Sequence, residues 1–115
     1  MKMKLSQLGE FGLIELIRRN SVLTADVVRG IGDDAAVLNF SGLGRDYYQL
    51  FTTDMLLEDV HFTRKMNAWA IGRKALACNI SDVAAMGGTP SSAVVSLAVP
   101  PDFKIHFIKE SMCKL

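Results

Sequence analysis

The chain has 115 residues, of which 50% are hydrophobic and 22% are charged, so its length suits one compact domain. Its 13 basic and 12 acidic residues leave a net charge of +1. So small a charge gives no reason to expect nucleic acid or an anionic membrane as the main partner. The uncharged stretch 83–101 contains Gly87, Gly88 and Pro90, which would interrupt a membrane-spanning helix.

The two cysteines and the amino terminus predict a cytoplasmic location. Cys78 and Cys113 fit neither a disulfide framework nor the spacing of a zinc site, which predicts reduced thiols. Near the amino terminus, Glu10, Glu15 and Arg18 interrupt the apolar pattern. A secretory signal peptide would need an uninterrupted apolar segment there, so residues 10–19 are instead predicted to form a short amphipathic helix ending near Asn20.

Two β-rich runs follow, at residues 35–40 and 47–53, separated by the glycine-containing segment 41–46. This pattern predicts an antiparallel hairpin with a loop longer than two residues. Asp33 and Asp34 precede the first run, and Asp54 follows the second. An antiparallel hairpin would bring these two ends together.

Residues 67–86 are predicted to form the main packing helix, because apolar residues recur at helical spacing and Gly87-Gly88 follows them. Its expected apolar face contains Trp69, Leu76, Ile80 and Val83, and Asp82 borders that face. The same helix carries Arg73 and Lys74, which are expected to be solvated charges, with a phosphate contact as the alternative.

The remaining residues predict a strand and a helix. Residues 93–99 are continuously apolar except for one serine and read as a strand buried on both faces. After two prolines, a last helix is expected with Asp102 as its N-cap and with Phe103, Phe107 and Ile108 on its apolar face.

Four aspartates at the ends of apolar elements suggest a metal site: Asp33, Asp34, Asp54 and Asp82. Two carboxylates ~5 Å apart at an effective dielectric constant of ~20 repel by roughly 3 kcal/mol, so an ionised cluster needs cations. Oxygen ligands without a histidine–cysteine cluster favour Mg²⁺ or Mn²⁺, which commonly share substrate phosphates. The alternative is that these are capping aspartates with no ligand.

Three ordered motifs, GIGDDAAV, FTTDMLLEDVHF and KALACNISDVAAMGGTPSSAVVSLAVP, resemble the amino-terminal domain of the thiamine-monophosphate kinase family. This family belongs to a superfamily that includes aminoimidazole ribonucleotide synthetase. The resemblance implies an α+β fold with a sheet of about four strands, covered by helices on one face. It also implies ATP as co-substrate, several Mg²⁺ ions, thiamine monophosphate as substrate, and a homodimer formed through the sheet.

The resemblance also assigns roles to individual residues. It implies no catalytic side chain in this chain, a substrate contact from His61 and a supporting role for Asp33. The implied magnesium ligands are Asp34, Thr52, Thr53, Asp54 and Asp82. Taken without the resemblance, a lone histidine such as His61 is more often structural than functional.

Residues 1–115 are expected to form a single amino-terminal domain that binds metal and substrate. The family's Gly-Gly-Asp-Thr loop and carboxy-terminal ATP-binding domain have no counterpart in this sequence, so the chain alone is expected to be inactive. Two alternatives stay open: a sibling ATP-dependent synthetase of the same superfamily, and a non-catalytic dimerisation or regulatory module.

Overall fold

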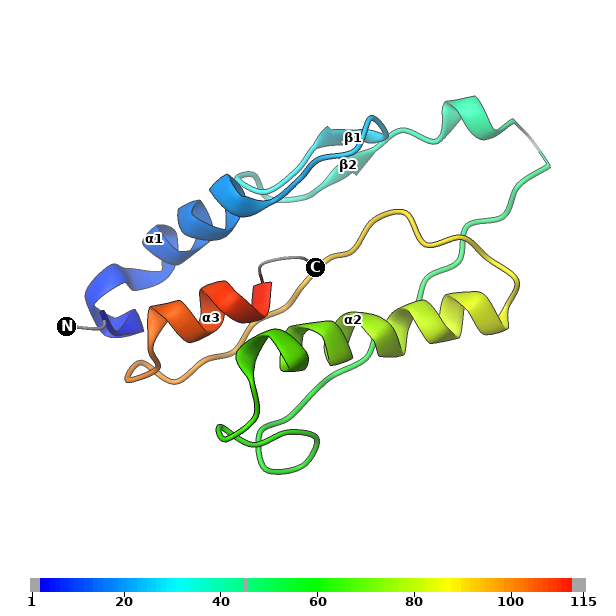
Figure 1. Ribbon diagram of the computed structural model, residues 1–115. Coiled ribbons are helices and arrows are strands. Elements are labelled where there is room, and N and C mark those ends of the chain that lie inside the picture. Colours follow the sequence, from blue (N-terminus) through cyan, green and yellow to red (C-terminus); the bar gives the residue numbers. More distant parts are fainter. Residues whose placement is uncertain (1–2, 45, 113–115) are drawn as a thin grey trace.

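The computed structural model describes residues 3–44 and 46–112, which form three α-helices, one short 3-10 helix and a two-stranded sheet (Figure 1). Cys113, one of the two predicted reduced cysteines, lies outside the described residues, and Cys78 is a free thiol. In chain order the elements are α1 (Leu5–Asn20), β1 (Val27–Arg29), β2 (Val37–Leu38), η1 (Ser41–Leu43), α2 (Ala68–Ala85) and α3 (Ile105–Met112).

The first helix, α1, confirms the helix predicted over residues 10–19 and ends at Asn20 as expected, although none of its residues is buried. It also includes one earlier turn, which is separated from the rest by a kink at Gly9 with φ of 74°. Glycine adopts this left-handed conformation without steric cost, whereas other residues rarely do. The sequence-based helix therefore corresponds to the regular part of α1 beyond the kink.

The last two turns of α1 hold a small charged cluster. The Glu15 carboxylate accepts hydrogen bonds from Arg18 and Arg19, with both Nε atoms at 2.7 Å. These two guanidinium groups lower the pKa of Glu15 to about 2. The two arginines also lie near the carboxyl end of the helix, where positive charge is favourable.

The amino-terminal end of α1 is fastened to the segment that precedes α3. The amide of Leu5 donates to the Phe103 carbonyl at 2.9 Å, and the amide of Ile105 donates to the Met3 carbonyl at 3.0 Å. An isolated antiparallel bridge between Lys4 and Lys104 lies between these two bonds. The first described residues of the chain and the segment before α3 are therefore joined through their backbones.

The hairpin predicted between residues 35–40 and 47–53 is wrong. Strand β2, within the first of these runs, pairs instead with the upstream strand β1, and Val27 lies opposite Leu38. The Asn39 amide extends this pairing by donating to the Asp26 carbonyl at 2.8 Å. The connection between β1 and β2 is short, so closing it costs little chain entropy. The two strands can therefore pair without a strand from elsewhere in the chain.

Helix α2 is confirmed close to its predicted limits. Asn67 is the N-cap, with its side-chain oxygen accepting from the amides of Trp69 at 2.9 Å and Ala70 at 3.4 Å. At the other end Gly87 adopts a φ of 72°, and its amide donates to the Ala84 carbonyl at 2.9 Å. A glycine in this conformation is a common helix terminator.

The packing face of α2 differs from the predicted one. Ala68, Ile71 and Gly72 are buried, whereas Trp69 of the predicted face is 43% exposed. The side of α2 that carries Gly72 is the one that meets α3. A Cβ atom added at Gly72 would lie 1.7 Å from the carbonyl oxygen of Ser111 on α3. The absence of a side chain at Gly72 therefore lets the two helix backbones approach closely.

Helix α3 begins at Ile105, so Asp102 does not serve as its N-cap as predicted. Ile108 is buried, with 2% of its surface exposed, which confirms its place on the apolar face. The rings of Phe103 and Phe107 meet edge to face, with their centroids 5.1 Å apart. In space α3 packs against α2 on one side and α1 on the other (Figure 1).

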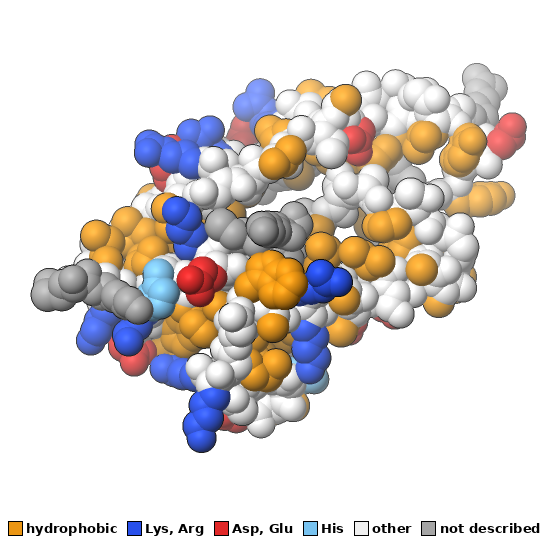
Figure 2. All heavy atoms as spheres, viewed as in Figure 1, with side chains coloured by type: hydrophobic (Ala, Val, Ile, Leu, Met, Phe, Trp, Pro, Cys, Tyr) orange, Lys and Arg blue, Asp and Glu red, His pale blue; other side chains and the backbone are white. Residues whose placement is uncertain are grey.

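The predicted strands at 47–53 and 93–99 are wrong for the described residues: both segments are extended but unpaired. Apolar side chains along them face solvent, with Tyr48 97% exposed, Phe51 87% and Val94 88%. Hydrophobic side chains are accordingly spread over the molecular surface (Figure 2). Such sequences are typical of central strands, and no described neighbour forms a ladder with them.

The architecture is α+β, as expected, but four strands are not confirmed because the described residues form a sheet of two. The β1–β2 ribbon extends beyond the carboxyl end of α1 and does not lie beneath the helices (Figure 1). Within residues 3–44 and 46–112, every helix is too short or too polar to cross a lipid bilayer.

Gly72→Ala should destabilise the protein. The new methyl group would overlap the Ser111 carbonyl, so we expect a loss of about 1–3 kcal/mol in the free energy of unfolding, measured by urea denaturation. Gly42→Ala is the control, because a Cβ at that position meets nothing within 4 Å. Equal stabilities of the two variants would show that α2 and α3 do not pack this closely.

Candidate functional site

Two of the predicted metal ligands from separate motifs are in direct contact. The Thr52 hydroxyl donates to the Asp82 carboxylate with an Oγ1–Oδ2 distance of 2.9 Å, although the residues are 30 positions apart. Asp82 lies in the last turn of α2, and Thr52 lies in the extended segment that passes beside it. Both side chains are exposed, so their oxygens remain open to a ligand.

Packing at the carboxyl end of α2 explains this contact. A Cβ atom at Gly88 would lie 2.5 Å from Cδ1 of Leu50 and 3.0 Å from Cγ1 of Val83. Leu50 therefore occupies the space beside the end of the helix, two residues before Thr52. Thr53 and Asp54 continue from there along the same exposed segment.

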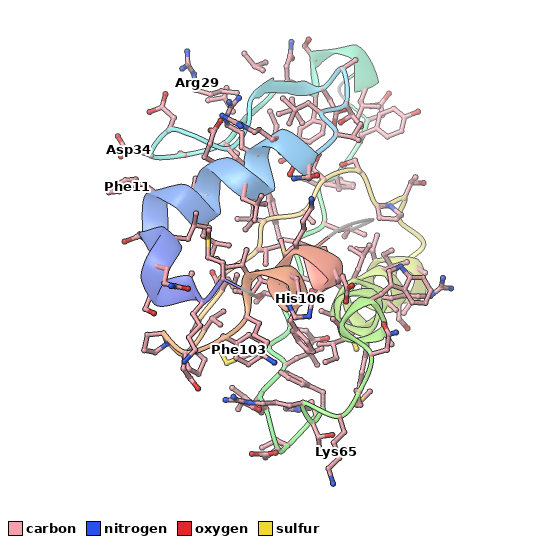
Figure 3. All side chains as sticks on the ribbon, turned by 60° about the vertical axis from the view of Figure 1, so that its left-hand side comes forward. Phe11, Arg29, Asp34, Lys65, Phe103 and His106 are labelled. Atoms are coloured by element: carbon pink, nitrogen blue, oxygen red, sulfur yellow. The ribbon has the colours of Figure 1, made fainter. Side chains whose placement is uncertain are left out.

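The acidic pair after the first glycine motif lies in the β1–β2 turn. The Asp33 carboxylate accepts from the Arg29 guanidinium at 2.9 Å and from the backbone amide of Asp34 at 3.0 Å. Arg29 thus provides a counter-charge for the Asp33 carboxylate. Asp34 is exposed and points outward from the ribbon (Figure 3).

The expected convergence of all the acidic residues is absent from the described part of the chain. Because β2 pairs with β1, no hairpin draws Asp33 and Asp34 toward Asp54. Among residues 3–44 and 46–112, no three His, Cys, Asp or Glu side chains form a group able to hold a metal ion. The assembled part of the predicted site is therefore the contact between Thr52 and Asp82.

The chemistry of this contact nevertheless suits magnesium. Mg²⁺ prefers oxygen ligands, keeps several waters, and is usually held by one or two carboxylates together with substrate phosphates. The contact supplies one carboxylate and one hydroxyl, and Asp54 is two residues from Thr52. The donor set fits an ion whose remaining ligands come from water and a phosphorylated substrate.

His61 lies in a tight loop that fixes its imidazole ring. The backbone amide of Leu57 donates to the ring Nδ1 at 3.0 Å, and the His61 amide donates to the Leu57 carbonyl at 2.9 Å. Asp59 has a φ of 62°, and its amide donates to the Phe62 carbonyl at 2.7 Å. The side chain is exposed, as a substrate contact requires.

Lys74 has a contact that the sequence did not suggest. Its ammonium group donates to the backbone carbonyl of His61 at 2.7 Å, whereas helical spacing predicted a solvated charge. Neighbouring Arg73 lies over the Trp69 ring, 5.4 Å from its centroid. Helical periodicity gives the face on which a lysine lies, but not the loop its side chain reaches.

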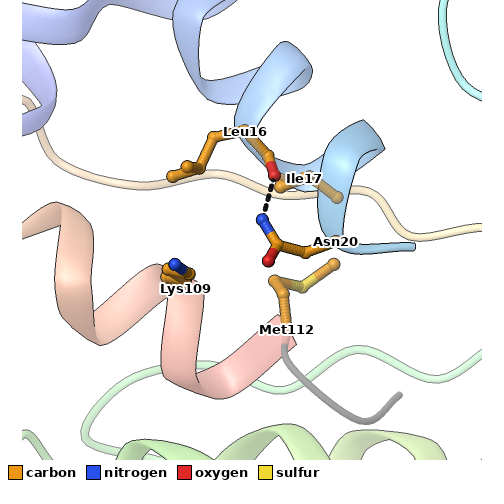
Figure 4. A pocket seen from close by; sticks show the side chains of 5 residues that line it. All are labelled: Leu16, Ile17, Asn20, Lys109 and Met112. Atoms are coloured by element: carbon orange, nitrogen blue, oxygen red, sulfur yellow. Dashed lines mark hydrogen bonds between the residues drawn. The ribbon is translucent and has the colours of Figure 1, made fainter.

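A hollow between α1 and α3 is separate from these residues. It is lined by Leu16, Ile17, Asn20, Lys109 and Met112 (Figure 4). The Asn20 side-chain amide donates to the Leu16 carbonyl at 2.7 Å, so this polar group is already engaged within α1. None of the predicted site residues lines this hollow.

Comparison with known proteins identifies the family. The sequence pattern of "AIR synthase related protein, N-terminal domain" matches residues 32–114, a span that includes the acidic turn, the Thr52–Asp82 contact and the His61 loop. The chain belongs to this family.

Several curated relatives carry the name thiamine-monophosphate kinase. The chain is 42% identical to the protein of Aquifex aeolicus over 107 residues, covering 93% of this chain and 32% of the relative. It is 44% identical to the Bacillus subtilis protein over 103 residues, covering 89% and 31%, respectively. The Methanocaldococcus jannaschii protein is 30% identical over 105 residues, covering 90% and 32%.

The chain thus spans about a third of the length of these curated relatives. No solved structure gives a significant match. The expected resemblance to the amino-terminal domain of thiamine-monophosphate kinases is confirmed by the family match and by these relatives.

Thr52→Val tests the contact on which the candidate site is built. Removing the hydroxyl should lower the free energy of unfolding by about 0.5–1 kcal/mol, because one exposed hydrogen bond to a carboxylate is lost. Thr53→Val is a matched control on the next residue, and urea denaturation of both measures the difference. A larger loss in the Thr53 variant would contradict the contact.

Proposed function

We propose that this chain is the metal- and substrate-binding part of an ATP-dependent kinase that converts thiamine monophosphate to thiamine diphosphate, a transferase of thiamine biosynthesis. The observation that carries the proposal is the Thr52–Asp82 contact, which joins two motifs that are present in a chain similar to curated thiamine-monophosphate kinases. It fits phosphoryl transfer because such enzymes act mainly by positioning charged phosphates.

In the proposed reaction, a phosphate oxygen of thiamine monophosphate attacks the γ-phosphorus of ATP in line. A new P–O bond forms as the bond between that phosphorus and the β,γ-bridging oxygen breaks. The electron pair of the broken bond leaves with ADP, and thiamine diphosphate is the other product. This chain supplies no general base to the step, in keeping with the small proton-transfer demand of an anionic nucleophile.

The role of the acidic residues is to hold magnesium against the phosphates. We assign Asp82 and Thr52 as the first magnesium ligands, with Thr53 and Asp54 beside them. Asp34 is proposed to become a ligand when substrate is bound. Asp33, paired with Arg29, supports the turn that carries Asp34. Bound magnesium would neutralise phosphate charge and orient the transferred group.

His61 is proposed to contact thiamine monophosphate. Its exposure and its fixed ring support this role, because a preorganised donor loses little conformational freedom on binding. ATP binding is proposed to depend largely on parts of the whole enzyme that correspond to the rest of the relatives' length. The 115-residue chain alone is then expected to bind metal and substrate without turnover.

The uncovered apolar segments support a homodimer as part of the same proposal. Tyr48, Phe51 and Val94 are all more than four-fifths exposed on unpaired extended segments, and a second copy would give them both apolar and backbone partners. A cytoplasmic location fits the free Cys78 thiol, and no nucleic-acid or membrane partner is proposed.

The proposal predicts that metal and substrate stabilise the chain together. Mn²⁺ or Mg²⁺ with thiamine monophosphate should raise the melting temperature more than either ligand alone, because the substrate phosphate completes the metal shell. At a ligand concentration about 100 times Kd the stabilisation would be about 2.7 kcal/mol. Differential scanning fluorimetry measures the shift.

Asp82→Asn and Asp34→Asn should each abolish this joint response, whereas Asp46→Asn, a change at an exposed acidic residue outside the motifs, should leave it intact. The ligand assignment fails if the first two variants respond like the unaltered chain. A chain that shows no metal-dependent shift with thiamine monophosphate would instead favour a non-catalytic module.

A further inference from the structure

The loop that carries His61 is fastened at both sides. On one side Lys74 of α2 donates to the His61 carbonyl at 2.7 Å. On the other, the Arg64 guanidinium pairs with both carboxylate oxygens of Glu58 and lies over the Phe103 ring, 4.8 Å from its centroid. The loop is therefore held between α2 and the segment before α3, and Phe103 and Lys65 mark this region in Figure 3.

The contact between Leu57 and His61 determines the tautomer of the ring. A backbone N–H only donates, so the Nδ1 atom that it meets at 3.0 Å must present its lone pair. In a neutral imidazole the single ring proton then resides on Nε2. The Leu57 amide thus selects one tautomer of the His61 ring, in which Nε2 is the hydrogen-bond donor.

Lys74 places this donor relative to the Thr52–Asp82 contact. Lys74 and Asp82 lie on the same helix, eight residues and therefore ~12 Å apart along its axis. Since α2 is continuous between them, the His61 loop and the carboxylate share one rigid support. A charge-assisted bond to the His61 carbonyl keeps the loop from moving independently of that support.

We propose that Lys74 is a positioning residue, which holds His61 as a neutral Nε2–H donor for an oxygen or nitrogen acceptor on the substrate. The identity of that substrate rests on the proposed function, whereas the tautomer and the role of Lys74 do not. Lys74 itself touches no substrate in this account, because its ammonium group is directed to the loop backbone.

Nitrogen-15 NMR of the histidine rings in the 115-residue chain tests the tautomer directly. At mildly alkaline pH, where a free imidazole is neutral, His61 should show a protonated Nε2 and an unprotonated Nδ1. A ring protonated at Nδ1, or an even mixture of tautomers, would overturn the inference whatever any variant does.

Lys74→Met should convert the His61 ring to a mixture of tautomers and speed hydrogen exchange at the Leu57 amide, while Lys74→Arg should restore both. Arg73→Met is the matched control, since Arg73 is the adjacent cation and contacts Trp69 instead of the loop. Unchanged tautomer and exchange in the Lys74→Met variant would show that Lys74 does not position the ring.

Calorimetric titration with thiamine monophosphate and Mg²⁺ separates this inference from the proposed function. If the unaltered chain binds, Lys74→Met should weaken binding by about 3- to 10-fold, with Arg73→Met unaffected. Equal affinities would overturn the substrate part of the inference. If the unaltered chain does not bind, the proposed function fails, and the NMR result alone decides whether Lys74 positions the ring.

Discussion

The close approach of α2 to α3 is the constraint on which the described structure depends. It exists because Gly72 has no side chain where the Ser111 carbonyl meets the helix. Buried Ala68 and Ile71 on α2 and Ile108 on α3 form the small core beside this contact. With α3 also packed on α1, these residues fix the orientation of α2, and α2 carries both Lys74 and Asp82. The geometry of the candidate site therefore depends on Gly72, which lies away from the Thr52 and Asp82 oxygens.

The small core contrasts with the amount of apolar surface left uncovered. A chain in which half the residues are hydrophobic buries few of them completely and exposes aromatic side chains such as Phe51 and Tyr48. Burial of apolar surface is the main favourable term in folding, so these segments gain stability only when something covers them. Tyr48 and Phe51 lie in the same segment as Thr52. Covering their apolar surface therefore involves the segment that contributes to the candidate metal site.

What the sequence predicted well were features encoded within a few residues. The limits of α2, the glycine at position 87 that ends it and the end of α1 at Asn20 follow from local chemistry, and all three agree with the structure. Strand pairing depended instead on which other segment of the chain lies beside a strand in the fold. The run that contains Val37 had the pattern of a strand, but nothing in that pattern distinguished β1 from residues 47–53 as its partner.

The candidate site was predictable in the same uneven way. The sequence pattern singled out Asp82, the family resemblance added Thr52, and the structure joins the two side chains at 2.9 Å. The counter-charge at Asp33 comes from Arg29, four residues upstream. The sequence argument considered only the repulsion between carboxylates and did not identify this arginine. Lys74 was missed because the reach of a long flexible side chain depends on a loop 13 residues earlier, which helical periodicity does not describe.

The most direct test of the account is paramagnetic broadening by Mn²⁺ in the presence of thiamine monophosphate. NMR signals from the amides of Thr52, Asp54 and Asp82 should broaden first, at manganese concentrations that leave Ser111 and Gly42 sharp. This result would place the ion at the contact between the extended segment and α2. Broadening that begins elsewhere, or that affects the whole chain uniformly, would contradict the claim that Thr52 and Asp82 form the start of a metal site.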